Sequence, residues 1–199
     1  FNPYTYKNEV DNYGQTHYQL HYSRNLGTET NVNIAGHYTH GEGYYEQEKL
    51  GEDLADYGLE NVIISDDTIT STDLIRRKWL NNDFGGVTYS LNHKMGNIDL
   101  ILGGASNRYS GQHYGNVIWA KYASDADYNH QYYWNKAEKL DHNFFAKANY
   151  AYSNSTNIYA DLQRRRIDYI FEGKDEDGNT AEQEVVLSFF NPKVGLFHD

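Results

Sequence analysis

The chain alternates between apolar and polar residues in three stretches, and each stretch predicts two antiparallel strands joined by a short polar turn. The expected hairpins span residues 16–39, 87–106 and 143–165. Because successive side chains of a strand point to opposite sides, Tyr18, Leu20 and Tyr22 should share one apolar face. A further strand is expected from about Phe189 to the end of the chain.

Matching the apolar faces predicts how the strands of each hairpin pair. In the first hairpin, a pairing centred on Gly27 places Tyr22 opposite Val32. In the second hairpin, the same criterion places Leu91 opposite Ile98. A slip by one residue would move every apolar side chain to the polar face, so the choice of face is strongly specified.

The third hairpin matches in charge as well as in apolar residues. A pairing centred on Asn154 puts Phe144 and Tyr150 on the apolar face and sets Lys147 across from Asp161 on the polar face. Opposite charges at directly opposed positions stabilise an antiparallel pair. The opposite charges therefore support this register.

The hairpins are separated by long polar segments, which we expect to be loops. These segments are residues 41–83, 107–140 and 167–188. Strict alternation of short turns with long loops places all turns at one end of the sheet and all loops at the other, as in outer-membrane barrels with short periplasmic turns and long extracellular loops. Connections this long are uncommon in compact domains. The predicted fold is all-β, an antiparallel up-and-down meander of about six or seven strands belonging to a larger transmembrane β-barrel.

Two other folds stay open at this point. One is a soluble carbohydrate-binding β-sandwich, in which exposed Tyr and Trp residues would form the sugar platforms. The other is a small autonomous outer-membrane barrel, although an odd strand count argues against it, because bacterial single-chain barrels have even numbers of strands.

The amino-acid composition argues against several classes of function. The formal net charge of −11 argues against nucleic acid as a partner, because phosphate neutralisation needs a basic surface. The absence of Cys excludes disulfides, thiolate catalysis and Cys-ligated zinc. The mean hydropathy of −0.84 and the shortness of the apolar runs exclude a transmembrane helix but not membrane strands, which hide their lipid-facing residues at alternate positions. No catalytic or cofactor-binding motif is present, so we expect neither an enzyme nor a cofactor.

Several stretches resemble the barrel of TonB-dependent receptors, especially those of the Bacteroidetes type. They are DNYGQTHYQLHY at 11–22, HYTHGEGYYE at 37–46, LIRRKWL at 74–80, LGGASNRY at 102–109, HYGNVIWA at 113–120 and FFNPKVGL at 189–196. The order of these stretches is kept over nearly the whole chain. The resemblance implies import of a scarce, bulky nutrient, such as an iron chelate (siderophore), haem, cobalamin or a glycan, across the outer membrane of a Gram-negative bacterium.

The chain departs from the family in what it lacks. It starts in mid-pattern at Phe1 and shows no plug domain, TonB-box segment or terminal aromatic strand. Barrels of this transporter class need about 22 strands, so residues 1–199 are expected to be an internal segment of one. The partners that the resemblance implies are outer-membrane lipid and lipopolysaccharide, the rest of the receptor with its plug, the TonB complex acting through that plug, and a small chelate or glycan ligand.

Aromatic and polar residues of the expected extracellular loops are the candidate ligand-binding residues. They are Tyr44, Tyr45, His113, Tyr114, Trp119 and Trp134. Aromatic rings there could stack on a sugar or a chelate. The alternatives are a solvated loop for the first two residues and an interfacial aromatic girdle for the remainder.

The remaining histidines and charged clusters are not expected to form binding sites. The predicted register sets His17 opposite His37, but lumen-facing imidazoles are commonly just solvated, and no metal site is predicted. Residues 76–78 and 164–166 are basic, and they could pair with lipopolysaccharide phosphates or, as we favour, with nearby acidic residues. The acidic stretch 175–179 lacks the ligand spacing of a calcium loop and is expected to be a hairpin tip.

Overall fold

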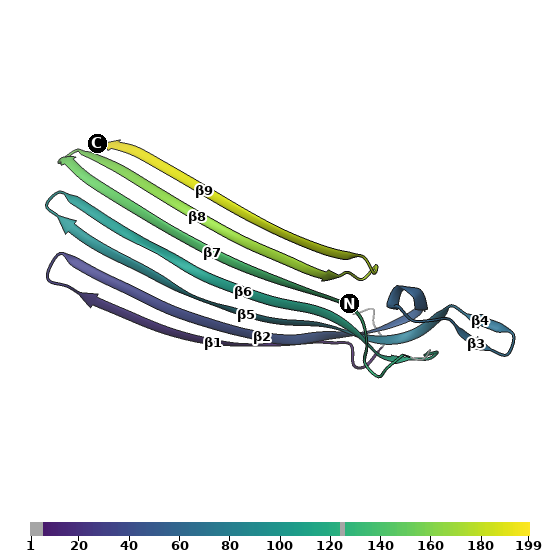
Figure 1. Ribbon diagram of the computed structural model, residues 1–199. Helices are drawn as coiled ribbons and strands as arrows, with labels where there is room; N and C mark the ends of the chain where they lie inside the picture. The colour runs from purple at the N-terminus through teal and green to yellow at the C-terminus, as the bar shows by residue number, and fades with distance from the viewer. Residues whose placement is uncertain (1–5, 124–125) are drawn as a thin grey trace.

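Long alternating strands dominate the computed structural model, which describes residues 6–123 and 126–199. Seven strands pair antiparallel in the order β1-β2-β5-β6-β7-β8-β9 (Figure 1). They are β1 (Val10–Asn25), β2 (Thr30–Asp53), β5 (Ser71–Met95), β6 (Ile98–Ala120), β7 (His130–Ser153), β8 (Thr156–Lys174) and β9 (Thr180–His198). A short 3-10 helix, η1 (Leu54–Tyr57), and a small hairpin of β3 (Val62–Ile64) and β4 (Asp67–Ile69) lie between β2 and β5. The up-and-down meander predicted from the sequence is confirmed.

The β1–β2, β5–β6 and β7–β8 turns lie at one end of the sheet, as predicted, and the β8–β9 turn at the other end has only five residues. Like Ser153 and Thr156 in the β7–β8 turn, Met95 and Ile98 in the β5–β6 turn pair directly and leave two residues between the strands. Gly96 takes a φ of 57° there, in the left-handed region that such turns favour. No helix in the described parts of the chain is both long and apolar enough to cross a membrane.

The predicted registers were correct in face and only partly correct in position. Lys147 pairs with Asp161 as predicted for the third hairpin. Tyr22 pairs with Ile34 instead of Val32, and Leu91 pairs with Leu102 instead of Ile98. Both shifts are even-numbered, so the apolar residues stay on the predicted face. Apolar matching therefore fixes the face, whereas the exact length of each turn fixes the register.

The expected long loops are much shorter in the structure. In place of the three expected loops, the connections between the long strands are residues 54–70, 121–129 and 175–179, and β9 begins at Thr180 instead of near Phe189. The added strand portions carry polar residues on both faces, so their ladders hold without the apolar alternation that sequence analysis detects. Residues 124 and 125 of the expected loop 107–140, like residues 1–5 of the expected domain, lie outside the described residues.

The face that carries the apolar side chains near the turns, here called the apolar face, is widely exposed. Leu20 is 76% exposed and Val194 is 82% exposed, and they lie on strands at the two sides of the sheet. Exposed apolar residues of this face also come from the strands between them, including Ile34, Tyr89, Phe144 and Leu162. A continuous apolar surface of this kind needs a covering layer of lipid or protein.

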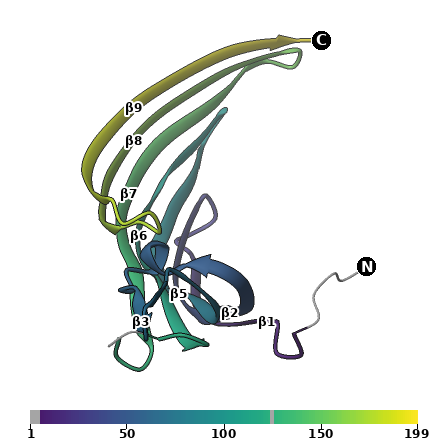
Figure 2. The same cartoon turned by 90° about the vertical axis from the view of Figure 1, so that its right-hand side faces the viewer.

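The opposite face, here called the polar face, is held by side-chain hydrogen bonds. Ser23 donates to Asn33 Oδ1 at 2.7 Å, and His37 Nε2 lies 3.0 Å from Asn107 Oδ1. The sheet is curved, and η1 and the β8–β9 turn lie on the same side of it (Figure 2). In the described residues, no second sheet packs on the apolar or polar face, as the sandwich alternative would require.

Candidate functional site

A groove of about 450 Å³ lies on the polar face near the loop end of the sheet. Two adjacent rows of paired residues build it. One row runs from Asp11 through Tyr45, Lys78 and Gly115 to Tyr133. The next row runs from Tyr13 through Gly43 and Leu80 to His113. The registers of five strands therefore bring together residues that lie far apart in the sequence.

Glycines provide the space that the aromatic rings of the groove occupy. A Cβ on Gly115 would lie 2.3 Å from Tyr133 Cε1 and 2.5 Å from Tyr132 Cε1. Likewise, a Cβ on Gly43 would lie 2.9 Å from Tyr13 Cδ2. Such distances are far below van der Waals contact, so the rings lie where any larger residue would clash.

Lys78 is the central charge of the groove. Its Nζ donates to both carboxylate oxygens of Glu176, each at 2.5 Å, and it lies 5.8 Å from the ring centroid of Tyr133. Glu176 belongs to the β8–β9 turn, which reaches back over the polar face past two intervening strands. Within that turn, Asn179 N donates to Asp175 Oδ1 at 2.8 Å, which orders the tip.

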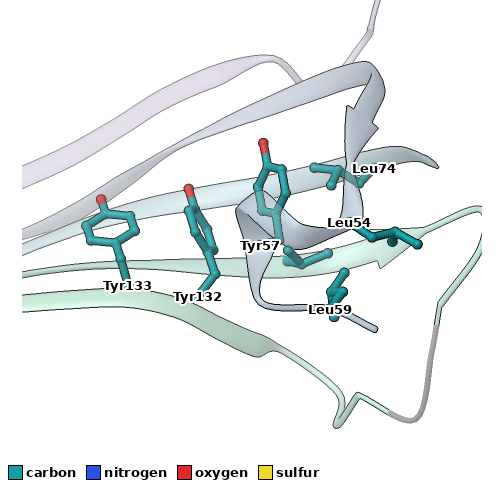
Figure 3. Close-up of a cluster of buried hydrophobic side chains, with 7 residues drawn as sticks. Leu54, Tyr57, Leu59, Leu74, Tyr132 and Tyr133 are labelled. Atoms are coloured by element: carbon teal, nitrogen blue, oxygen red, sulfur yellow. The ribbon is translucent and has the colours of Figure 1, made fainter. Parts of the chain in front are cut away.

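Next to the groove, η1 folds onto the sheet and makes the one buried apolar cluster of the described residues (Figure 3). The cluster comprises Leu54, Tyr57, Leu59, Leu74, Val117, Tyr132 and Tyr133. Tyr57 connects the loop to the strands, because its hydroxyl donates to Glu52 at 2.7 Å and accepts from Arg76 Nη1 at 3.0 Å. Burial and the hydrogen bond to Glu52 raise the pKa of Tyr57 well above its usual range. The first loop is thus fixed in place.

Two polar atoms in this neighbourhood have no hydrogen-bond partner among the described residues. They are the hydroxyl of Tyr132 and Nε of Arg76, both fully buried. Tyr132 is only 4% exposed, and its ring lies 4.8 Å from that of Tyr57 and 5.0 Å from that of Tyr133. Buried polar groups without hydrogen-bond partners cost free energy, so these two atoms lower the stability of the loop end of the sheet.

The structure divides the six predicted ligand residues between the two faces. Tyr45 and His113 line the groove from register positions on the polar face, and Tyr44 also borders it. Tyr44, Tyr114 and Trp134 occupy the register positions that face the other way, because neighbouring residues of a strand point to opposite sides.

Trp119 lies near the end of β6, where it is 49% exposed and borders a small cavity of about 150 Å³ beside the β6–β7 connection. It is separate from the groove. The sequence did not bring Tyr13, Lys78, Tyr133 and Glu176 together as a site, since only the observed registers and the fold of the β8–β9 turn do so.

On the apolar face, Tyr44, Trp79, Tyr114 and Trp134 form a row across four strands, here called the outer aromatic row. The ring centroids of Tyr44 and Trp79 are 4.6 Å apart, and those of Trp79 and Tyr114 are 5.9 Å apart. The row shares its face with the exposed apolar band but lies farther from the short turns than His40 and Asp83.

Most of the basic residues in the two predicted clusters have protein partners. Arg77 Nε lies 2.7 Å from Glu46, and Arg166 Nη2 lies 2.7 Å from Asp168. Arg165 pairs with Asp141. These contacts support the interpretation that the basic residues form ion pairs within the chain. They do not favour the alternative, in which the basic residues bind phosphate groups.

The predicted juxtaposition of His17 and His37 was wrong, because the register is shifted by two residues. His17 pairs with Thr39, and their side chains approach to 2.9 Å. No group of three or more potential metal ligands occurs in the described residues.

The side chains of the paired residues Lys147 and Asp161 have other contacts as well. Asp161 accepts a hydrogen bond from the Tyr159 hydroxyl at 2.9 Å, and the Lys147 ammonium lies 5.0 Å from the Phe145 ring centroid.

Comparison with known proteins gives a match in structure alone. No protein family and no curated protein sequence matches the chain. Among solved structures, the chain resembles the crystal structure of the ferric-catecholate import receptor Fiu from E. coli K12 in its open form, with a TM-score of 0.64 and 9% sequence identity. The match covers 94% of this chain and 34% of that receptor. The fold is therefore that of a β-barrel segment of a TonB-dependent receptor, and the chain spans about a third of the receptor it matches.

Proposed function

We propose that the chain forms part of the barrel wall of a TonB-dependent outer-membrane receptor that imports an iron chelate. The observation that carries this proposal is the contrast between the two faces of a single-layer sheet. One face exposes apolar side chains on strand after strand, and the other carries hydrogen-bonded polar groups and a groove. Membrane barrels have this arrangement, with lipid outside and a polar lumen inside.

The length of the apolar band fits a bilayer. On β9, exposed apolar side chains of the apolar face recur from Val186 to Leu196. A tilted transmembrane strand needs about 9–11 residues to cross the hydrocarbon core. Beyond the band, the same face turns polar, with Arg108 paired to Glu138 and His40 paired to Asp83. These polar groups would lie above the lipid.

The edges of the sheet supply the second argument. β1 and β9 each pair with one neighbour among the described strands. Unpaired backbone groups are costly in lipid, so membrane sheets close into barrels. We infer that further strands of the receptor pair with both edges, and that a plug domain lies against the polar face and couples the receptor to the TonB complex.

The iron chelate is the substrate class that the likeness to Fiu favours. Haem, cobalamin and glycans, which the sequence also allowed, are compatible with a groove of tyrosines, one lysine and one histidine, but no observation selects them. The Bacteroidetes type stays a prediction from the sequence. A soluble sugar-binding domain is disfavoured, because it would leave the apolar face in water.

The test uses the full-length receptor that contains this sheet, expressed in a strain that lacks its own copy. We expect the receptor in the outer-membrane fraction, with heat-modifiable migration on gels. Uptake of ⁵⁵Fe from an anionic chelate should depend both on the receptor and on an intact TonB complex. Recovery of the protein in the soluble fraction without detergent would refute the membrane assignment, whereas correct insertion without iron uptake would refute only the substrate.

A further inference from the structure

The ion pair between Lys78 and Glu176 joins a central strand to a distant turn, and it is the basis of this inference. We propose that residues 175–179 of the β8–β9 turn, here called the latch turn, place the Glu176 carboxylate in an anion site on Lys78, from which an anionic ligand displaces it. The physiological source of that ligand rests on the proposed function. The site itself does not.

The two partners of the pair differ in exposure. The side chain of Lys78 is 13% exposed, whereas that of Glu176 is 48% exposed. The ammonium is thus the fixed, enclosed member, and the carboxylate reaches it from the solvent side. Among the described residues, Glu176 supplies the one carboxylate within 4.0 Å of Lys78 Nζ. A largely enclosed ammonium needs an anion, so loss of Glu176 would leave a site that another anion stabilises.

The surroundings of Lys78 suit an exchangeable anion. Tyr45 pairs directly with Lys78 across the strands, and the ring of Tyr133 lies beneath the ammonium. His113 and Tyr13 border the same groove. The tyrosines and His113 offer hydroxyl and imidazole donors to a second anionic oxygen. Asp11 also borders the groove, but its carboxylate is not within 4.0 Å of Lys78 Nζ.

The latch turn is built to move as a unit. Asp175 and Asn179 bond to each other through backbone and side chain, with Asp175 N 2.9 Å from Asn179 O. Gly178 adopts a φ of 83°, and its N donates to Asp175 O at 3.2 Å. The turn therefore keeps its internal bonds when the Glu176 side chain leaves Lys78. The Glu176 carboxylate and an anionic ligand compete for one ammonium, so binding of the ligand and docking of the turn on Lys78 are mutually exclusive.

The experiment measures binding and turn mobility in the purified full-length receptor in detergent. The probes are ferric tris(catecholate), which is an anion, and a neutral ferric trihydroxamate. Glu176→Gln removes the competing charge with little change in shape, and we expect it to raise the affinity for the anion about threefold to tenfold and to leave that for the neutral probe unchanged. Asp177→Asn, in the same turn but without an ion pair in the structure, is the matched control and should change neither affinity.

A double-mutant cycle with Lys78→Met assigns the effect to the pair. The gain from Glu176→Gln should disappear when Lys78 is absent. A spin label on the latch turn should become more mobile in the unmodified receptor when the anion binds, and it should already be mobile in Glu176→Gln. Unchanged anion affinity in Glu176→Gln, or a gain that persists in Lys78→Met, would overturn the latch. Anion-driven release of the turn in a receptor that imports no iron would keep the latch and reject the proposed substrate.

Discussion

Tyr133 occupies the space above Gly115, so that a Cβ on the glycine would lie 2.3 Å from the ring. This contact holds one wall of the groove and one edge of the buried cluster in the same place. A methyl group at this position can be accommodated only by displacing Tyr133 and Tyr132 together.

We therefore predict that Gly115→Ala destabilises the loop end of the receptor by about 1–3 kcal/mol, the usual cost of overpacking. Ligand affinity should fall as well, because the Tyr133 ring lies beneath Lys78. Urea unfolding of the detergent-solubilised receptor and a binding titration measure the two effects. Gly14→Ala is the control, since a Cβ added to Gly14 would have no other atom within 4 Å, and equal behaviour of the two variants would contradict the packing role.

The proposed contact of the apolar face with lipid predicts a contrast between adjacent residues. Leu20→Arg puts a charge on the apolar face, whereas Gln19→Arg puts it on the polar face. The first substitution should cost about 2–4 kcal/mol if Leu20 lies near the bilayer midplane, and the second should cost little. The yield of heat-modifiable receptor in lipid vesicles measures the difference, and similar yields would show that lipid does not cover this face.

The ion pair of Arg77 with Glu46 should stabilise the sheet more than an exposed pair does. Glu46 is 4% exposed and also accepts a hydrogen bond from the Tyr6 hydroxyl at 2.6 Å. Glu46→Gln should lower stability by about 1–3 kcal/mol, because it weakens charge-assisted bonds at a buried acceptor. Lys49→Met, which removes a more exposed pair with Glu52, should change stability by less than about 1 kcal/mol. A melting experiment that ranked the two variants in the opposite order would disprove this assignment.

Two neighbouring tyrosines predict opposite responses to loss of a hydroxyl. Tyr57→Phe removes the bonds to Glu52 and Arg76 and should speed proteolysis of the first loop. Tyr132→Phe removes a buried hydroxyl without a partner among the described residues, so its effect should be neutral or stabilising. The interpretation fails if Tyr132→Phe proves the more damaging change in limited proteolysis.

The pKa of Tyr57 adds a dependence on pH. Because the folded state raises this pKa above the ordinary value of 10.0, ionisation is disfavoured in the folded protein. The associated stability is fully present below pH 10 and is lost as the pH rises towards the folded pKa. Loop proteolysis should therefore accelerate in strongly alkaline buffer in the unmodified receptor, and Tyr57→Phe should remove that part of the pH dependence.

The sequence predicted which face each strand residue occupies better than it predicted the exact pairing. Lys147 and Asp161 were placed opposite each other because charge and apolar pattern agreed there. Tyr22 was displaced by two residues, because an apolar pattern with a period of two is unchanged by such a shift. Strand length was underestimated wherever polar residues occupied both faces, as between Gly41 and Asp53.

The groove was only half predictable. Tyr45 and His113 were singled out for their chemistry, yet their chain neighbours Tyr44 and Tyr114 were grouped with them and face the other way. Lys78 and Glu176 are 98 positions apart, and no local pattern couples them. Only the fold of the latch turn over the sheet brings them into contact.

Under the proposed placement in the outer membrane, the length of β2 determines how far the sheet extends from the cell surface. Its 24 residues span roughly 80 Å at about 3.3 Å per residue, whereas the lipid-facing band of a barrel is about 25 Å tall. More than half of the strand would then stand above the bilayer, braced by its neighbours. A bacteriophage or an antibody would contact a hydrogen-bonded sheet there, and the connecting segments would lie only at the outer end of that sheet.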